Sequence, residues 1–242
     1  MPETFPALLA ELLRADPGRP LVTFYDDATG ERVELSVVTY ANWVAKASSL
    51  LVEELDLEVG DRVLVDLPTH WLGPVFLGAA WNAGLVVCFP GAVVAEDVQA
   101  VLCGPDDLTT YADLAGRVPV VASALLPLGV RFPSALPEGV HDFGIEVWGQ
   151  PDSFIPFDPP GPSSAAVHAG ATQAELVTPA ATELVAPGGR LLTTANPVSA
   201  DGLTSLLSPL VGGGSTVWVR NADPDLLDRR HDDERCTARW VV

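Results

Sequence analysis

The side chains that could do chemistry in this chain of 242 residues are few and widely spaced. The four histidines stand apart from one another: His70, His141, His168 and His231. None has the closely spaced second ligand that a metal site needs. The three cysteines are also far apart and odd in number: Cys88, Cys103 and Cys236. This pattern excludes a disulfide framework and a zinc site, and we expect reduced, buried thiols.

The motifs that suggest nucleophiles or ligand sites have simple structural explanations. The sequence contains no Gly-x-Ser-x-Gly elbow, and the serines near Gly161 and Gly202 lack a matching His/Asp arrangement. Residues 231–234, His-Asp-Asp-Glu, could hold a cation, but a solvated acidic helix end explains them. Residues 199–202 are typical of a helix cap rather than a ligand site. Glycines 212–214 indicate a helix stop and a tight turn rather than a phosphate contact.

The best candidate ligand loop spans residues 168–172, His-Ala-Gly-Ala-Thr. It runs from the carboxyl end of a predicted strand into the amino-terminal end of a predicted helix, where α/β proteins bind anions. The candidate nucleotide contacts are His168, Gly170, Ala171 and Thr172. Glu175 follows closely, and its charge would repel a triphosphate. We therefore expect no metal and no obligatory cofactor, and nucleotide binding at this loop stays an open alternative.

Composition and charge limit the partners that the protein can have. The chain is 48% hydrophobic, with a mean hydropathy of +0.27, and can therefore bury a core. Its formal net charge of −19 argues against nucleic acids and anionic membrane surfaces as partners. Lys46 is the only lysine, so a reaction that needs a lysine must use it. With no signal peptide and no apolar run near the ~20 residues of a membrane helix, we expect a soluble, cytoplasmic protein.

Short apolar runs alternate with helical patterns along most of the chain. This alternation predicts an α/β fold, with a mainly parallel sheet flanked by helices, in a single domain over residues 1–242. Thr4 is a plausible cap for the first helix. Further helices are expected at 96–102, 141–148 and 172–185. The Pro-rich stretch 150–164 is a possible internal linker, expected to join two parts of one sheet. Four buried strands are expected in that sheet: Arg62–Asp66, 85–89, 165–168 and 190–194.

Several short sequence motifs follow one another in a characteristic order between residues 35 and 90. They are Leu35-Ser36 opening a helix, Gly60-Asp61-Arg62-Val63 before a strand, Leu67-Pro68, and Asn82-Ala83-Gly84 leading through an apolar strand to Pro90. In this order they resemble the amino-terminal part of the adenylate-forming (AMP-binding) superfamily, which includes acyl-CoA synthetases, peptide-synthetase adenylation domains and luciferases. Residues 190–219 resemble a later segment of that superfamily. The whole is most similar to a short, uncharacterised bacterial family that resembles these enzymes.

The resemblance implies the fold of the amino-terminal subdomains of acyl-CoA synthetase-like enzymes, and it also shows what this sequence lacks. Those enzymes carry a phosphate-binding loop of the type TSGTTGxPKG, and the corresponding stretch here is 168–175. Gly170 and Thr172 match, whereas the second glycine, the proline and the lysine are replaced and Glu175 adds a negative charge. We also expect the later nucleotide motifs and the domain with the catalytic lysine to be missing. The resemblance thus implies a degenerate phosphate loop and loss of acyl-adenylate formation.

Two classes of function follow. The leading hypothesis is a non-catalytic relative of adenylate-forming enzymes that acts as a binding or scaffold protein. The alternative is a weak nucleotide- or acyl-adenylate-binding protein that works with a partner supplying the missing catalytic half. We also expect a homo-oligomer, a twofold dimer, because a chain ending at Val242 would leave apolar surface uncovered. The candidate contact is the apolar terminal segment 236–242, which offers an open sheet edge.

Overall fold

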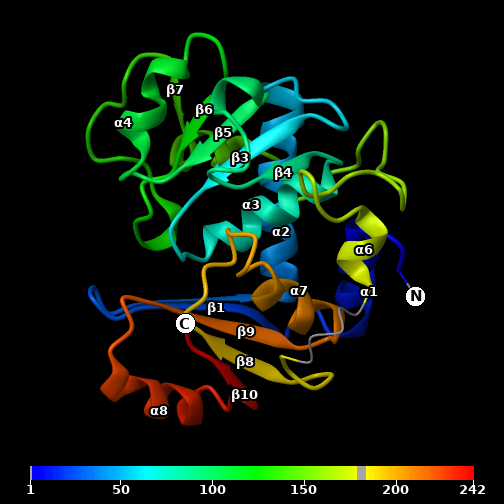
Figure 1. Cartoon of the computed structure of the whole chain (residues 1–242), viewed down its shortest axis with the longest axis vertical. Coiled ribbons are helices and arrows are strands. Elements are labelled where there is room, and N and C mark those ends of the chain that lie inside the picture. The colour runs from blue at the N-terminus through cyan, green and yellow to red at the C-terminus, as the bar shows by residue number, and fades with distance from the viewer. Residues whose placement is uncertain (1, 179–183) are drawn as a thin grey trace.

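Two β-sheets, rather than one, organise the protein (Figure 1). A computed structural model describes residues 2–178 and 184–242. One sheet, here called sheet A, lies at the bottom of Figure 1, and the other, sheet B, lies at the top, with helices between them. Among the described residues, no helix has both the length and the apolarity needed to cross a membrane.

Sheet A joins the start of the chain to its end. Its strand order is β10-β8-β9-β1-β2. The bounds are β1 Pro20–Asp26, β2 Glu31–Ser36, β8 Arg190–Thr193, β9 Ser215–Arg220 and β10 Ala238–Trp240. The hairpin β1–β2 is antiparallel, as its turn residues predict, and every other pairing in the sheet is parallel.

Sheet B is entirely parallel. Its bounds are β3 Arg62–Asp66, β4 Val86–Cys88, β5 Ala100–Cys103, β6 Val120–Ala122 and β7 Val140–Asp142. Its strand order is β4-β3-β5-β6-β7, so that the first strand along the chain lies between the second and the third. This is the order of a doubly wound sheet, in which ligands bind outside the carboxyl ends of the strands.

The helices α2 (Val37–Ser49), α3 (Leu72–Asn82) and α7 (Thr204–Val211) form the layer between the sheets. The main hydrophobic cluster lies here and includes the inner faces of both sheets, for example Phe24 and Trp218 of sheet A and Val63 and Val87 of sheet B. The α2 helix continues as a π-helical turn, Leu50–Glu54. Because α3 is apolar on all sides, as its sequence predicts, burial on every side is what stabilises it.

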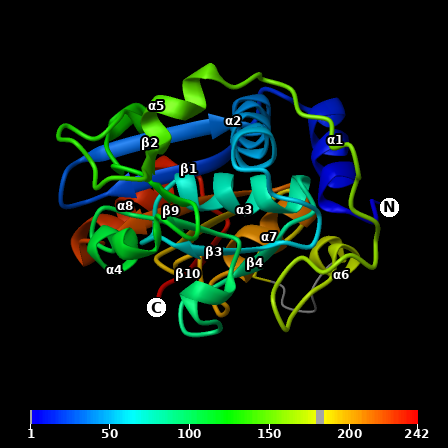
Figure 2. The same cartoon turned by 90° about the horizontal axis from the view of Figure 1, so that it is seen from above.

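The remaining helices cover the outside. On the outer face of sheet A lies α8 (Pro224–Asp233), and α4 (Leu108–Tyr111) packs on the outer face of sheet B. In Figure 2, α1 (Phe5–Ala15) and α6 (Gln173–Val177) lie together at one end, and α5 (Phe143–Glu146) follows β7. Short 3₁₀ turns complete the fold at Ala95–Asp97, Ala112–Leu114, Pro127–Gly129 and Val147–Gly149.

The predicted fold class is confirmed, but the single sheet was wrong. Strands β3 and β4 lie in sheet B, whereas β8 lies in sheet A. The predicted strand 165–168 is only a pair of isolated bridges, one of which joins Val167 to Val87 at the edge of sheet B. The stretch 150–164 thus leads from the β7 edge of sheet B to the bridge at β4, on the opposite edge of the same sheet, and the next full strand, β8, belongs to sheet A. Buried parallel strands have the same apolar sequence in either sheet, so composition could not assign them.

Two predicted helices also differ from the structure. Residues 100–102, expected as the end of a helix over 96–102, belong to strand β5 (Ala100–Cys103), a fully buried run that pairs with β3. Residues 141–142 close the short strand β7, and the helix begins only at Phe143. Apolar runs this short fit either a buried strand or a helix, and the neighbouring strand decides between them. The helix predicted at 172–185 is helical at Gln173–Val177, and its later part lies partly outside the described residues.

Candidate functional site

A cavity of about 550 Å³ opens at the carboxyl ends of β3, β4 and β8, where the two sheets approach each other. Four chain segments form its walls, one at the end of each of these strands and the loop that contains residues 167–171. The lining residues are Asp66, Leu67, Phe89, Pro90, Ala92, Val167, His168, Ala169, Gly170, Ala171, Asn196, Val198, Ser199, Ala200 and Leu203. The lining is mainly apolar, and ligand sites of α/β proteins are commonly found at this edge.

The loop 165–172 forms one wall as a tight turn fixed by its own backbone. The N–H groups of Ala166 and Val167 both donate to the carbonyl of Ala171, and Ala169 adopts a positive φ of 51°. The indole N–H of Trp81 in α3 donates to Ala166 O at 3.1 Å. The buried amide of Gln173 bridges α1 and α3, because it accepts from Phe5 N and donates to Trp81 O, each at 3.0 Å. The loop is therefore anchored to the central helices.

The amides that begin helix α6 are already occupied. The N–H of Gln173 donates to Ser164 O, and that of Ala174 donates to Pro162 O, each at 2.9 Å. Thr172 and Glu175 form a reciprocal capping box. The Glu175 carboxylate accepts from Thr172 N at 2.8 Å and from Thr172 Oγ1 at 2.9 Å. These bonds hold the pKa of Glu175 below its ordinary value, so the loop's donors already serve an internal anion.

The opposite wall is a turn that joins the two sheets. The side-chain amide of Asn196, after β8, donates to Leu67 O after β3 at 2.8 Å. Ser199 Oγ donates to Asn196 O at 2.8 Å and accepts from Gly202 N at 2.9 Å. The turn needs glycine at 202, because a Cβ there would lie 1.8 Å from Asn196 O. Residues 199–202 thus stabilise a turn before α7, whose own N-cap, Leu203, has no side-chain capping bond.

The charged group in the cavity wall is acidic. Asp66, at the carboxyl end of β3, accepts a hydrogen bond from Tyr111 Oη at 2.6 Å. Burial, this bond and the negative charge of Asp66 raise the pKa of Tyr111, which keeps its proton on the phenol. Neither lysine nor arginine lines the cavity in the described part of the chain. An ionised phosphate in this cavity would therefore face a carboxylate without a balancing side-chain cation.

Lys46 is not among the residues that line this cavity, and its contacts lie elsewhere. It belongs to α2, as predicted, and its ammonium donates to Gln150 O. It also forms an ion pair with Asp152 at 3.1 Å. Lys46 thereby fastens the start of the stretch 150–164 to the helical layer, and it cannot replace the missing loop lysine.

Comparison with known proteins shows to which family this chain belongs. No protein-family model matches the sequence. A protein of Mycobacterium tuberculosis described as a TIGR03089 family protein is 39% identical over 238 residues, which cover 96% of this chain and 95% of the relative. The chain belongs to this family.

Solved structures show that the family has the fold of the amino-terminal part of acyl-CoA synthetases. The acyl-CoA synthetase of Brucella canis matches with a TM-score of 0.77 at 15% identity, over 97% of this chain and 47% of that chain. A benzoate CoA ligase from Burkholderia xenovorans LB400 matches with a TM-score of 0.72 at 17% identity, over 97% and 49%. The N-terminal domain of FACL13 from Mycobacterium tuberculosis matches with a TM-score of 0.70 at 14% identity, over 96% of this chain and 61% of that chain. This chain spans about half the length of the first two enzymes.

The structure brings three of the four predicted nucleotide contacts to the cavity of this family member. His168, Gly170 and Ala171 line it, whereas Thr172 caps α6. Whether they bind a nucleotide stays a prediction. Sequence reasoning missed Asp66 and Asn196, although Asp66 ends the apolar strand β3 and Asn196 stands shortly after the apolar strand β8, which was the available signal.

Two other sequence predictions have clear outcomes. All three cysteines are free and buried, as expected, and burial raises the pKa of each thiol.

The acidic run 231–234 is only partly solvated. Asp232 is exposed, but the Glu234 side chain is only 9% exposed and is bound by Arg190 and Arg32. Its burial under the outer face of sheet A could not be seen in the sequence.

Proposed function

We propose that this protein is a non-catalytic member of the adenylate-forming fold that binds a small, mainly apolar ligand in the cavity at the carboxyl edge of its sheets. It acts as a binding or scaffold protein and does not form acyl adenylates. Its three buried free thiols suit a reducing compartment, and we place it in the cytoplasm.

The observation that carries this proposal is that the backbone N–H groups at the start of α6 already donate hydrogen bonds to other groups of the protein. A phosphate-binding loop offers backbone N–H groups and a positive charge to the ligand. Here the first amides of α6 donate to Ser164, Pro162 and Thr172, and the Glu175 carboxylate lies where an anion would have to approach. The acidic lining at Asp66 adds to the repulsion. ATP thus loses both the hydrogen bonds and the charge compensation that it needs.

The cavity itself supports a binding role. Its volume of about 550 Å³ lies within the range of small-molecule sites, and most of its lining is aliphatic or aromatic. Its walls are fixed by the Asn196 turn on one side and the Trp81-anchored loop on the other. A preformed apolar cavity with few polar groups favours a ligand with an apolar body.

We expect no ATP–pyrophosphate exchange above a no-protein control with any carboxylic acid. Glu175→Lys should not restore exchange, because the N–H groups of residues 173 and 174 would still donate to the carbonyls of Ser164 and Pro162, respectively. Radioactive or chromatographic exchange assays on purified protein give the answer. Exchange by the unmodified protein would overturn the proposal.

A thermal-shift screen separates the leading proposal from the alternative. Apolar small molecules should raise the unfolding midpoint, since ligand at 100 times its Kd stabilises by ~2.7 kcal/mol. Ala200→Trp should abolish the shift, because the exposed Ala200 lines the cavity. Ala28→Trp, in the exposed hairpin turn, is the matched control. A shift with AMP or an acyl-adenylate analogue, lost in Ala200→Trp, would instead favour a nucleotide-binding protein that works with a catalytic partner.

We also propose that the protein forms a twofold homodimer through β10. Within residues 2–178 and 184–242, this strand pairs only with β8 and stands at the edge of sheet A, so its outer side offers unpaired backbone groups to a second copy. The exposed Val241 and Val242 follow it and add apolar surface. The net charge of −19 opposes association, but at ~0.15 M salt the screening length is about 8 Å, which lets a short-range apolar contact prevail.

Light scattering at micromolar concentration should give the mass of two chains, and the dimer should strengthen with salt. Val241→Asp or deletion of residues 240–242 should shift the protein towards monomer. Val94→Asp is a suitable control, because Val94 is also exposed but lies between β4 and β5, in the other sheet. A monomer of 25.4 kDa would contradict the proposal, and a dimer unaffected by Val241→Asp would place the contact elsewhere.

A further inference from the structure

Three arginines meet at the edge of sheet A that lies opposite the cavity. They surround a hollow of about 360 Å³ at the amino-terminal ends of β1, β8 and β9, beside the end of α8. The arginines are Arg19, Arg190 and Arg235. The tight turns 187–189 and 212–214 form its floor, and the N–H groups of Gly212, Gly213 and Gly214 are all bonded to carbonyls of α7. Any ligand here must therefore be held by side chains.

Arg19 is a partly buried cation without an acidic partner. Its Nη1 donates to Gly214 O at 2.6 Å, and its Nη2 is shielded from solvent without a hydrogen-bond partner. No ion pair of Arg19 is found in the described part of the chain. Burial lowers the pKa of Arg19, and only the more distant Asp16 opposes this effect. A buried charge of this kind is stabilised by a counter-ion.

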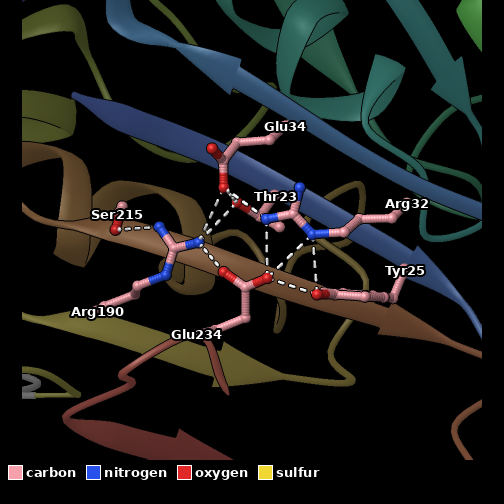
Figure 3. A network of polar contacts seen from close by, with 7 residues as sticks. All are labelled: Thr23, Tyr25, Arg32, Glu34, Arg190, Ser215 and Glu234. Carbon is pink, nitrogen blue, oxygen red and sulfur yellow. Dashed lines mark hydrogen bonds and ion pairs between the residues drawn. The ribbon is translucent and has the colours of Figure 1, made fainter. Parts of the chain in front are cut away.

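Arg190 also lines the hollow. Figure 3 shows its Nη1 bonded to Ser215 and its Nη2 to Thr23, Glu34 and Glu234. Its Nε is buried, and the guanidinium also interacts with the Cys236 thiol, where it opposes the rise of the thiol pKa. Arg235, exposed at the end of α8, likewise has no acidic partner in that part of the chain.

The carboxylates around the hollow are already engaged. Glu34 accepts from Arg32 at 2.8 Å, and Glu234 accepts from Arg32 and Tyr25 as well as from Arg190 (Figure 3). Asp233 pairs with Arg229 at 3.3 Å. The hollow thus has guanidinium donors left over and no carboxylate left to satisfy them, in a protein whose overall charge is strongly negative.

We propose that this hollow binds a phosphate group, held by Arg19, Arg190 and Arg235. Several guanidinium groups around one point match the many acceptor oxygens of a tetrahedral oxyanion, and such bonds are among the strongest hydrogen bonds in proteins. The buried Nη2 of Arg19 is already removed from water, so the anion gains this bond without displacing solvent from the donor. Binding requires the Arg19 side chain to rotate, because Nη2 is shielded in the free protein. The site lies on the opposite edge of sheet A from the apolar cavity and is independent of the function proposed for that cavity.

Isothermal titration of the full chain with inorganic phosphate, at constant ionic strength set with chloride, tests this site. We expect saturable binding, with the Kd raised about tenfold or more in Arg19→Gln, because a lost charge-assisted bond of ~1.5 kcal/mol corresponds to that factor. Arg235→Gln should weaken binding without affecting the fold, because Arg235 is exposed. Arg117→Gln, an exposed arginine near sheet B, is the matched control and should bind as the unmodified protein does.

The same titration with glycerol phosphate identifies the source of the phosphate group. Tighter binding of the monoester indicates that the hollow takes the phosphate of a larger molecule, and tighter binding of the free ion indicates inorganic phosphate. Absence of saturable binding of both would overturn the proposal. Binding that is unchanged in both Arg19→Gln and Arg235→Gln would overturn it equally.

Discussion

Replacing Glu234 with alanine is expected to lower the free energy of unfolding by about 3–5 kcal/mol, the cost typical of breaking a buried ion pair. The Glu234 side chain is 9% exposed and accepts hydrogen bonds from Tyr25, Arg32 and Arg190 (Figure 3). Burial alone would raise the pKa of Glu234, but these three donors hold it below its ordinary value. Removing the carboxylate would leave the Arg190 guanidinium, 13% exposed, without its strongest partner.

Urea unfolding measured by circular dichroism checks this result, with Asp228→Ala as the control. Asp228 also lies on α8 and also pairs with an arginine, Arg239 at 2.7 Å, but its side chain is 90% exposed. Exposed ion pairs contribute about 0–1 kcal/mol, so Asp228→Ala should be nearly neutral. Equal effects of the two substitutions would show that the burial of Glu234 has no energetic consequence.

The second large effect is a loss of stability in mild acid that depends on His70. This side chain is 2% exposed, and its Nδ1 accepts the N–H of Leu72 at 3.2 Å. It packs against Phe24 and Trp71, with ring centroids at 4.8 and 5.5 Å. Burial lowers the pKa of His70 to about 3, helped by the positive charge of Arg220 and opposed by Asp26. The folded protein therefore keeps this ring neutral.

The direction of the pH effect follows from this lowered pKa. The unfolded chain takes up the proton below its ordinary pKa of about 6.5, whereas the folded chain resists protonation until about 3. Stability is therefore lost as the pH falls through this window, by about 2 kcal/mol between pH 6.5 and 5. The measurement is a series of urea unfolding curves at several pH values.

His70→Asn should flatten this dependence, because an asparagine oxygen can accept the same Leu72 N–H but does not titrate. His168→Asn, a substitution at a half-buried position in the cavity wall, should leave the dependence unchanged. A steep loss of stability that persists in His70→Asn would assign the effect to other groups.

Local structure followed closely from neighbouring residues. Thr4 caps α1 by accepting the N–H of Ala7, as the sequence predicts, and β3 has the predicted bounds Arg62–Asp66. Capping depends on a side chain and an amide three residues away, and a strand's apolar run lies entirely within itself. The hairpin β1–β2 was predictable for the same reason, since its turn is adjacent to both strands.

The candidate site was predictable only in part. The loop 168–172 could be found because it directly follows an apolar run, and Glu175 indicated a weakened phosphate site. Glu175 and Thr172 exchange hydrogen bonds only three positions apart, which is a contact that local sequence can reveal. By contrast, the amides of residues 173 and 174 are occupied by the carbonyls of Ser164 and Pro162, which depends on how the preceding Pro-rich stretch folds back. The residues of the loop itself contain no pattern that predicts these two hydrogen bonds.

The sequence by itself determined most of the helices and strands, the α/β class, the negative charge and the lack of a lysine in the loop. Only the tertiary structure decided that the strands form two sheets, that Glu234 is buried and that Asp66, His168 and Asn196 line one cavity. The physical reason is the range of the interactions. Helix caps, turns and apolar runs involve residues a few positions apart. The strands β1 and β9 are far apart in the sequence, so their pairing depends on how all the elements between them in the chain pack together.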